Sequence, residues 1–164
     1  MTEHEDGTTG GDAADEDGPR MVGMNHVALE VGDLAAAESF YGSVFELRVR
    51  GRTETGLFLD MGDQFLPLME VEETGPPDDH RHVGLVVDDA ASVERQLRDT
   101  DAELLDARGL EFQDPWGNRL QVVEYRDVQF TKADHVLAGM GVDGAKSEDA
   151  LAELAAKGMA PEEE

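Results

Sequence analysis

The chain contains no cysteine among its 164 residues. Disulfide frameworks, thiolate metal sites and cysteine nucleophiles are therefore excluded. No stretch approaches the roughly 20 uninterrupted apolar residues that a membrane-spanning helix requires. The acidic, glycine-rich start also lacks the basic patch and the apolar run of a secretory signal. We therefore expect a cytoplasmic protein without a membrane partner.

Basic residues are scarce. Thirteen lysines and arginines stand against 38 acidic residues, so the formal net charge is −25, and only three of the basic residues are lysines. Such a chain lacks the basic surface that neutralises phosphates, so nucleic acid is excluded as a partner. The composition resembles that of proteins from salt-accumulating cytoplasms, where concentrated salt screens the repulsion between acidic side chains. We predict a halophilic protein, and a merely acidic mesophilic protein is the alternative.

The chain divides into three parts. Residues 1–20 are too polar to pack and are predicted to form a disordered acidic arm. Residues 21–126 carry regular hydrophobic patterns and form the predicted domain. Residues 127–164 form a C-terminal extension with two predicted helices, at 131–138 and 147–157.

The central part contains an internal repeat. The segment HVALEVGD at 26–33 returns as HVGLVVDD at 82–89. In each copy the final aspartate is a suitable N-cap for an amphipathic helix. Three short strand candidates follow each helix, at 47–52, 56–61 and 65–71 in the first copy and at 103–105, 108–112 and 119–125 in the second. A duplication of this kind predicts an α+β fold made of two βαβββ modules, one about 22–72 and the other about 80–126.

Side-chain alternation then predicts which residues share a face. The large apolar residues of each first strand must face the helices, so His26 and His82 face the opposite, concave side of the sheet. The same alternation places Glu30, Gln121, Val123 and Tyr125 on that concave side. With the two copies aligned at their turn glycines, Gly62 and Gly117, the same parity adds Leu66, Leu68 and Glu70. If the modules pack around a pseudo-twofold axis, the two histidines meet near it. Two histidines with an oxygen ligand commonly hold a divalent metal.

Three segments together resemble a known superfamily: HVALEVGDLAAAESFYGSVFEL, HVGLVVDDAASVERQL and FQDPWGNRLQVVEY. They resemble the vicinal oxygen chelate superfamily, which includes glyoxalase I, extradiol dioxygenases, fosfomycin-resistance enzymes and bleomycin-resistance proteins. The resemblance implies two βαβββ modules related by pseudo-twofold symmetry, which form a curved, cleft-shaped mixed sheet. It also implies a homodimer and, in most members, a metal inside the cleft.

The resemblance implies His26, His82 and Gln121 as metal ligands, although glutamate is usual at the third position. A glutamine oxygen can coordinate a metal but brings no negative charge, and the pseudosymmetric fourth position, Leu66, cannot coordinate. The expected ion is a divalent metal such as Fe, Mn, Ni, Zn or Co. Two acidic residues expected in the same cavity, Glu30 and Glu70, are the predicted catalytic groups that move a proton.

Two functions follow from this pattern. The first is a metal-dependent enzyme acting on a small oxygen-bearing molecule, by lyase or isomerase chemistry of the glyoxalase type or, second, by dioxygenase chemistry. The alternative is a metal-free protein that binds or sequesters a small molecule, as bleomycin-resistance proteins do.

Overall fold

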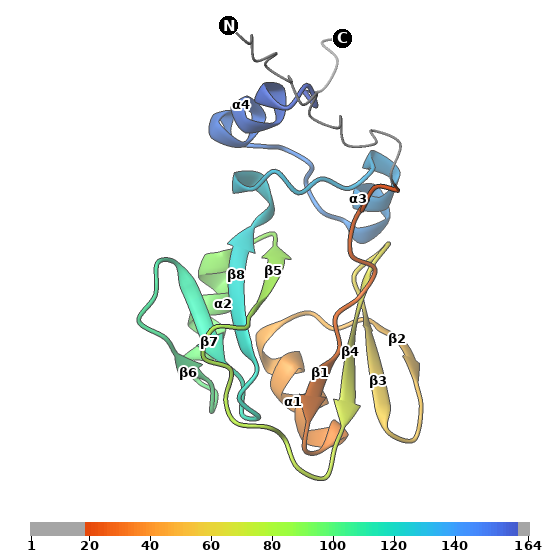
Figure 1. Cartoon of the computed structure of the whole chain (residues 1–164), viewed down its shortest axis with the longest axis vertical. Coiled ribbons are helices and arrows are strands. Elements are labelled where there is room, and N and C mark those ends of the chain that lie inside the picture. Colours follow the sequence, from red (N-terminus) through yellow and green to blue (C-terminus); the bar gives the residue numbers. More distant parts are fainter. Residues whose placement is uncertain (1–18, 161–164) are drawn as a thin grey trace, which may run out of the picture.

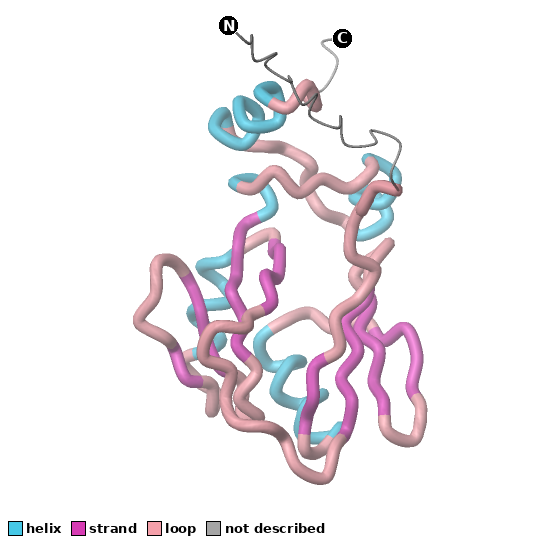
Figure 2. The backbone as a smooth tube through the Cα atoms, viewed as in Figure 1, coloured by secondary structure: helices cyan, strands magenta, loops and turns pink. Residues whose placement is uncertain are grey.

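A computed structural model describes residues 19–160 and shows two modules of the same element order (Figures 1 and 2). The first contains β1 (Leu29–Val31), α1 (Leu34–Val44), β2 (Val49–Arg52), β3 (Gly56–Asp60) and β4 (Phe65–Glu70). The second contains β5 (Val83–Val87), α2 (Ala90–Leu97), β6 (Glu103–Leu104), β7 (Leu110–Gln113) and β8 (Arg119–Glu124). The predicted α+β fold with a βαβββ repeat is confirmed. Residues 1–18 of the predicted acidic arm lie outside the described residues.

Both module helices begin at the predicted aspartates. The side chain of Asp33 accepts a hydrogen bond from the Ala36 backbone N–H at 2.7 Å. Asp89 accepts one from the Ser92 backbone N–H at 2.8 Å. Each carboxylate satisfies a backbone donor that the first helical turn leaves unpaired, which explains why both helices begin at these positions.

Each module folds into its own four-stranded mixed sheet. The strand orders are β1-β4-β3-β2 and β5-β8-β7-β6, with the β1–β4 and β5–β8 pairs parallel and the other pairs antiparallel. Among the described strands, no ladder joins the two sheets, so β1 and β5 are both edge strands. These two edge strands point in opposite directions (Figure 1).

The modules share one hydrophobic core. It contains alternate residues of the strands, such as Leu29 and Val31 in β1 and Leu120 and Val122 in β8, together with apolar residues of both helices. The turn between β7 and β8 also reaches the first module, because the Trp116 ring lies against Gly32 at the end of β1. The two copies are therefore held together on the helix side of their sheets.

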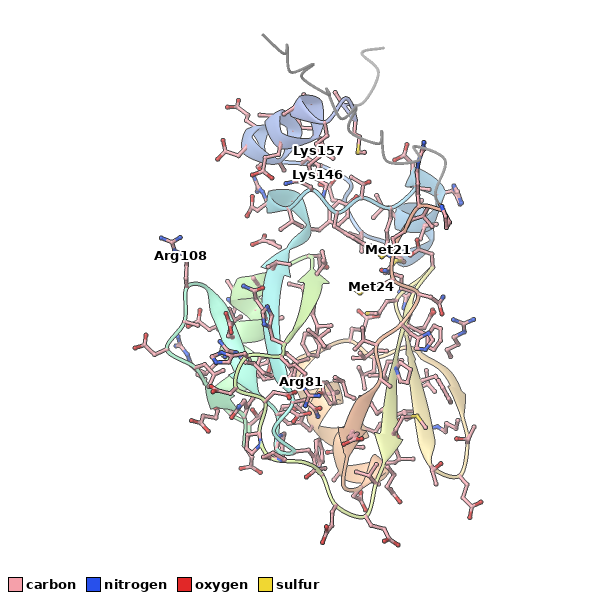
Figure 3. All side chains as sticks on the ribbon, in the orientation of Figure 1. Met21, Met24, Arg81, Arg108, Lys146 and Lys157 are labelled. Carbon is pink, nitrogen blue, oxygen red and sulfur yellow. The ribbon has the colours of Figure 1, made fainter. Side chains whose placement is uncertain are left out.

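The C-terminal segment crosses one end of both modules (Figure 1). It contains the 3-10 helix η1 (Tyr125–Asp127), α3 (Asp134–Met140) and α4 (Glu148–Ala156), and so confirms the two predicted helices. Lys146, which precedes α4 (Figure 3), donates hydrogen bonds to the carbonyl oxygens of Tyr125, Val128 and Phe130. These hydrogen bonds hold the start of α4 against the segment that follows β8.

None of the helices within residues 19–160 is both long and apolar enough to cross a bilayer.

Candidate functional site

Both predicted histidine ligands have one ring nitrogen held by a neighbouring oxygen. The Nδ1 atom of His26 lies 2.8 Å from Oδ1 of Asn25, and the ring stacks on Phe65 with 4.7 Å between centroids. The Nδ1 atom of His82 lies 3.1 Å from the carbonyl oxygen of His80. An oxygen acceptor at Nδ1 favours the Nδ1–H tautomer and leaves Nε2 free as a metal ligand. Both rings are exposed.

His82 and Gln121 lie on the same face of the second sheet. Gln121 is the register partner of Gly84, and His82 precedes Gly84 by two positions on the same strand path. The helix-facing positions of β8 are Leu120 and Val122, which are both buried. The alternation predicted for Gln121 is therefore correct, and His82 and Gln121 share the open face of the sheet.

The corresponding prediction for the first module is wrong by one residue. Leu68 is the register partner of Leu29 and Glu70 that of Val31, so Leu66, Leu68 and Glu70 lie on the helix side and not in the concavity. The two turns differ in length: four residues (61–64) join β3 to β4, whereas five (114–118) join β7 to β8. Alignment at the turn glycines therefore shifted the strands by one position, and such a shift moves every side chain to the other face.

The register also identifies a different pseudosymmetric partner for Gln121. Leu68 pairs with Leu29 just as Val122 pairs with Leu85, so Pro67 and not Leu66 occupies the position that Gln121 has in β8. Proline has no side-chain ligand atom, so the first module adds no fourth ligand at this position.

The two predicted catalytic carboxylates lie apart from each other. Oε2 of Glu70 accepts a hydrogen bond from the Leu34 backbone N–H at 2.8 Å, so this side chain caps the start of α1. Glu30 is exposed on the open face and lines a small depression with Arg81, Trp116 and Asn118. Glu70 therefore has a structural contact, whereas the Glu30 carboxylate makes no hydrogen bond or ion pair within residues 19–160.

The sequence interpretation missed Glu111, which is the register partner of Gln121 on β7. Its carboxylate is almost fully buried and accepts hydrogen bonds from Nε and Nη2 of Arg119, at 2.8 Å and 2.6 Å. An acidic group therefore lies beside the neutral amide that replaces the expected glutamate. The register between β7 and β8 sets this pairing, which explains why residue spacing did not reveal it.

Within one chain, His26 and His82 lie near opposite ends of the two edge strands. The end of β1 lies beside the start of β5, because the Glu30 carbonyl oxygen accepts a 2.8 Å hydrogen bond from Nδ2 of Asn118, just before β8, the parallel neighbour of β5. Glu30 also shares its depression with Arg81, next to His82. Strand residues rise about 3.3 Å each, so the four steps from His26 to Glu30 span about 13 Å. The chain by itself does not bring the two imidazoles together.

The described residues also contain no group of three or more histidine, aspartate or glutamate side chains placed to hold one metal ion. A site of the predicted kind has two imidazoles and an amide oxygen, so it does not require such a group.

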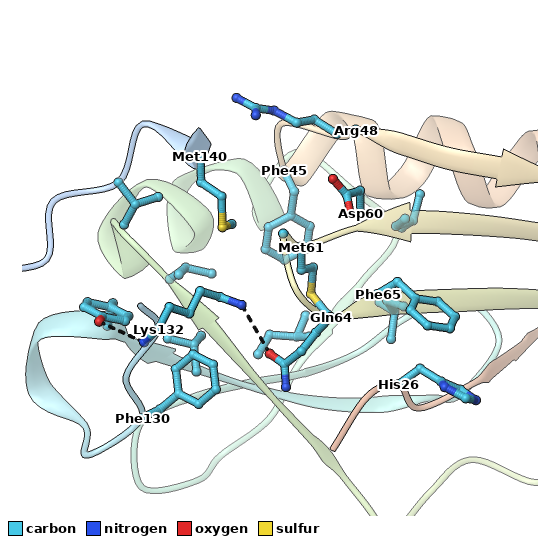
Figure 4. Close-up of a pocket in the computed structure, with 18 of the residues that line it drawn as sticks. His26, Phe45, Arg48, Asp60, Met61, Gln64, Phe65, Phe130, Lys132 and Met140 are labelled. Atoms are coloured by element: carbon cyan, nitrogen blue, oxygen red, sulfur yellow. Dashed lines mark hydrogen bonds between the residues drawn. The ribbon is translucent and has the colours of Figure 1, made fainter. Parts of the chain in front are cut away.

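A cavity of about 390 Å³ lies between the modules and the C-terminal segment (Figure 4). Its walls come from α1, the β3–β4 hairpin, β5 and residues 125–142. Of the five predicted site residues, only His26 lines it, and Figure 4 shows His26 beside Phe65, at the far side of the cavity from Phe130. The predicted metal ligands and this cavity therefore share only His26.

The family model of the Glyoxalase/Bleomycin resistance protein/Dioxygenase superfamily matches residues 23–122. The chain belongs to this superfamily. The match covers both modules and confirms the resemblance read from the three sequence segments. It ends within β8, so the cavity-lining residues from Tyr125 onwards lie outside the matched range.

Solved structures with the superfamily fold resemble the chain over both modules. A fosfomycin resistance protein from Mesorhizobium loti is 18% identical, with a TM-score of 0.53 over 63% of this chain and 92% of that one. A lactoylglutathione lyase from Agrobacterium tumefaciens is 22% identical, with a TM-score of 0.51 over 64% and 95%. A fosfomycin resistance protein from Listeria monocytogenes, complexed with Mn(II) and sulfate, is 13% identical, with a TM-score of 0.55 over 74% and 99%. At such identities the likeness establishes the fold alone. No protein of curated function matches the chain.

Proposed function

We propose that this superfamily member is a divalent-metal-dependent enzyme of the glyoxalase-like lyase or isomerase type, acting on a small oxygen-bearing molecule. The observation that carries the proposal is the similar Nδ1 contact of the two histidines. Each has its Nδ1 atom near an oxygen acceptor, 2.8 Å away for His26 and 3.1 Å for His82, which leaves Nε2 available. A hydrogen bond at the ring nitrogen that does not bind the metal is typical of metal-ligating histidines.

We further propose that the site forms between the subunits of a homodimer. His26 of one subunit would join His82 and Gln121 of the other, because the two histidines of one chain lie near opposite ends of β1 and β5. Both strands are edge strands within the chain, so their free backbone groups are available to a second copy. Two neutral imidazoles and an amide oxygen fit a divalent first-row transition-metal ion such as Zn, Mn, Fe, Co or Ni.

The chain's own residues supply the remaining chemistry of the proposal. A bound metal would act as a Lewis acid on neighbouring substrate oxygens. Glu111, beside Gln121, is the nearest buried carboxylate and is our first candidate for moving a proton, held in place by Arg119. Glu30, exposed on the open face of β1, is the second candidate, and Glu70 is not proposed because it caps α1.

Two relatives support the choice of chemistry without deciding it. The fosfomycin resistance protein from Listeria monocytogenes holds Mn(II), and the Agrobacterium tumefaciens protein is a lactoylglutathione lyase. Dioxygenase chemistry is a weaker proposal, because non-haem iron oxygenases use two histidines and a carboxylate and Gln121 provides no charge.

The test combines metal analysis with mixed dimers. Untagged wild-type protein dialysed against divalent ions should bind about one metal per chain, and His26→Ala and His82→Ala should each abolish binding. Mixing the two variants should restore about half of the sites in the heterodimer, because one site then contains both native histidines. A monomeric protein, or mixed variants that stay metal-free while each variant remains folded and dimeric, would contradict a site formed between subunits.

A metal-free binding protein is the second candidate function. It is favoured by the missing negative charge at Gln121 and by Pro67 at the pseudosymmetric position. Less than about one tenth of an equivalent of bound metal at neutral pH would favour this function over the enzyme. Gln121→Glu separates the two functions further, because the added carboxylate should tighten metal binding only if the residue is a ligand.

A further inference from the structure

Most of the protein's aromatic residues line one cavity. The chain has nine phenylalanine, tyrosine and tryptophan residues, and five of them line the 390 Å³ cavity: Tyr41, Phe45, Phe65, Tyr125 and Phe130. Three of the seven methionines, Met24, Met61 and Met140, line it as well. Aromatic faces and edges favour offset-stacked or edge-to-face contact with another ring, and thioether sulfur also contacts rings favourably.

The cavity is partly a product of the C-terminal segment. Six lining residues come from this segment, after the superfamily match ends at residue 122: Tyr125, Phe130, Lys132, Leu137, Met140 and Val142. Hydrogen bonds hold this wall in place, because Lys146 binds the carbonyl oxygens of Val128 at 3.0 Å and Phe130 at 2.6 Å. The Lys146 ammonium also lies 3.4 Å from the centre of the Tyr125 ring. The wall is therefore anchored independently of any ligand.

One cation lies in this mostly apolar wall. The Lys132 side chain is only 7% exposed and pairs with Asp63, while its Nζ atom lies 3.5 Å from Oε1 of Gln64 (Figure 4). It also lies 5.4 Å from the centre of the Phe130 ring. A lysine ammonium has three donors, of which one binds Asp63 and a second reaches Gln64. The ammonium can therefore donate a further hydrogen bond to an oxygen inside the cavity.

From these features we infer that the cavity is a binding site for a planar aromatic molecule that carries an oxygen acceptor. Its volume falls within the range of about 300–1,000 Å³ that small-molecule sites occupy. The rings and methionines would enclose the aromatic plane, and Lys132 would bind the oxygen. This site shares only His26 with the proposed metal site: His82, Gln121 and Glu111 do not line it.

Binding of 2-naphthol, a planar aromatic molecule with one hydroxyl oxygen, tests the inference. Titration of the full chain should show saturable 1:1 binding. With methyl-labelled methionine, the NMR signals of Met24, Met61 and Met140 should shift, while those of Met69 and Met159, which do not line the cavity, should stay in place. Absence of saturable binding, or equal shifts at Met69 and Met159, would overturn the inference.

Matched variants locate the contacts. Phe130→Ala should weaken 2-naphthol binding about tenfold or more, because stacking and apolar contact are lost. Phe58→Ala removes another half-buried ring that does not line the cavity, and it should change affinity less than about twofold. Lys132→Met should weaken 2-naphthol but leave naphthalene binding nearly unchanged, because only naphthol offers an oxygen acceptor. Equal losses in Phe130→Ala and Phe58→Ala would place the ligand elsewhere.

Discussion

The Tyr41 hydroxyl donates a 2.7 Å hydrogen bond to Oδ2 of Asp114, and this bond joins the two modules. Tyr41 lies on α1 of the first module, and Asp114 begins the β7–β8 turn of the second. Asp114 also accepts hydrogen bonds from the backbone N–H groups of Trp116 at 3.0 Å and Asn118 at 2.8 Å. Burial raises the pKa of Asp114 above its usual range. Burial and the nearby carboxylate raise the pKa of Tyr41 well above 10.0.

Tyr41→Phe should destabilise the protein by about 1–3 kcal/mol, because it leaves a buried carboxylate without one of its donors. Denaturant unfolding measures the change. Tyr125→Phe is the matched control, since the Tyr125 hydroxyl only accepts a long 3.3 Å bond from the Lys132 backbone N–H. Equal losses in the two variants would show that the Tyr41–Asp114 bond contributes nothing specific to the contact between modules.

Gly62 lies where α3 of the C-terminal segment contacts the β3–β4 turn. A Cβ atom on Gly62 would come within 2.6 Å of Sδ of Met140 and 3.1 Å of Cγ1 of Val136. Its φ of 84° also lies in the left-handed region, where an L side chain is strained. The position therefore combines a backbone constraint with a close approach.

Gly62→Ala should lower the free energy of unfolding by about 1 kcal/mol more than Gly109→Ala does. Gly109 has a φ of 106°, but an added Cβ there meets open space, so its variant isolates the backbone strain of about 1–2 kcal/mol. Chemical denaturation measures both. The same loss in each variant would mean that α3 moves aside at no cost.

The ion pair between Lys132 and Asp63 predicts a pH dependence. The hydrogen bond from the lysine ammonium lowers the pKa of Asp63 below 3.8, the value of a free aspartate. The unfolded state therefore takes up this proton at higher pH than the folded state. The stabilisation is complete above the unfolded pKa and is lost as the pH falls through the lower folded pKa.

Asp63→Asn should cost about 0.2–1 kcal/mol at neutral pH, because the carboxylate is half exposed and solvent screens the pair. The difference in free energy of unfolding between Asp63→Asn and wild type should disappear as the pH falls below 3.8. Asp106→Asn removes an exposed charge that forms no ion pair within residues 19–160, and its difference from wild type should show no such change with pH. Urea unfolding across the acid range measures these differences. A difference between Asp63→Asn and wild type that stays constant with pH would contradict a lowered pKa of Asp63 in the folded protein.

The net charge of −25 predicts a strong response to salt. The Debye length falls from about 30 Å at 0.01 M to about 3 Å at 1 M, so KCl should raise the thermal midpoint by about 5 °C or more over that range. Replacing four exposed acidic residues by their amides should raise the low-salt midpoint and reduce the response to KCl; the four are Glu72, Glu73, Asp101 and Asp106. A midpoint that does not change with KCl would contradict the halophilic prediction.

Local features of the fold could be predicted because their causes are local. Asp33 and Asp89 cap the predicted helices since a carboxylate reaches the backbone donors only three residues ahead. The strands of both modules lie within a few residues of their predicted bounds, because alternation of apolar residues marks them directly. The repeat itself then indicated the superfamily fold.

The sequence-based predictions that were wrong or incomplete concern the pairing between strands. Glu70 was placed on the wrong face because the two hairpin turns differ by one residue, and turn glycines alone do not reveal that difference. Glu111 was missed for the same reason, since its position beside Gln121 depends on the β7–β8 register. The cavity at Phe130 could not be predicted, because its walls come from segments far apart in the chain.

For this protein, the sequence alone determined the secondary structure, the duplication and the chemistry available, because these depend on neighbouring residues and on composition. The tertiary structure decided which side chains meet. Strand register set the side of the sheet for Glu70 and Glu111, and packing of the C-terminal segment gathered aromatic rings from distant parts of the chain into one cavity. The physical reason is that register depends on turn length and on long-range packing, so a shift of one residue reverses a face without disturbing the local pattern.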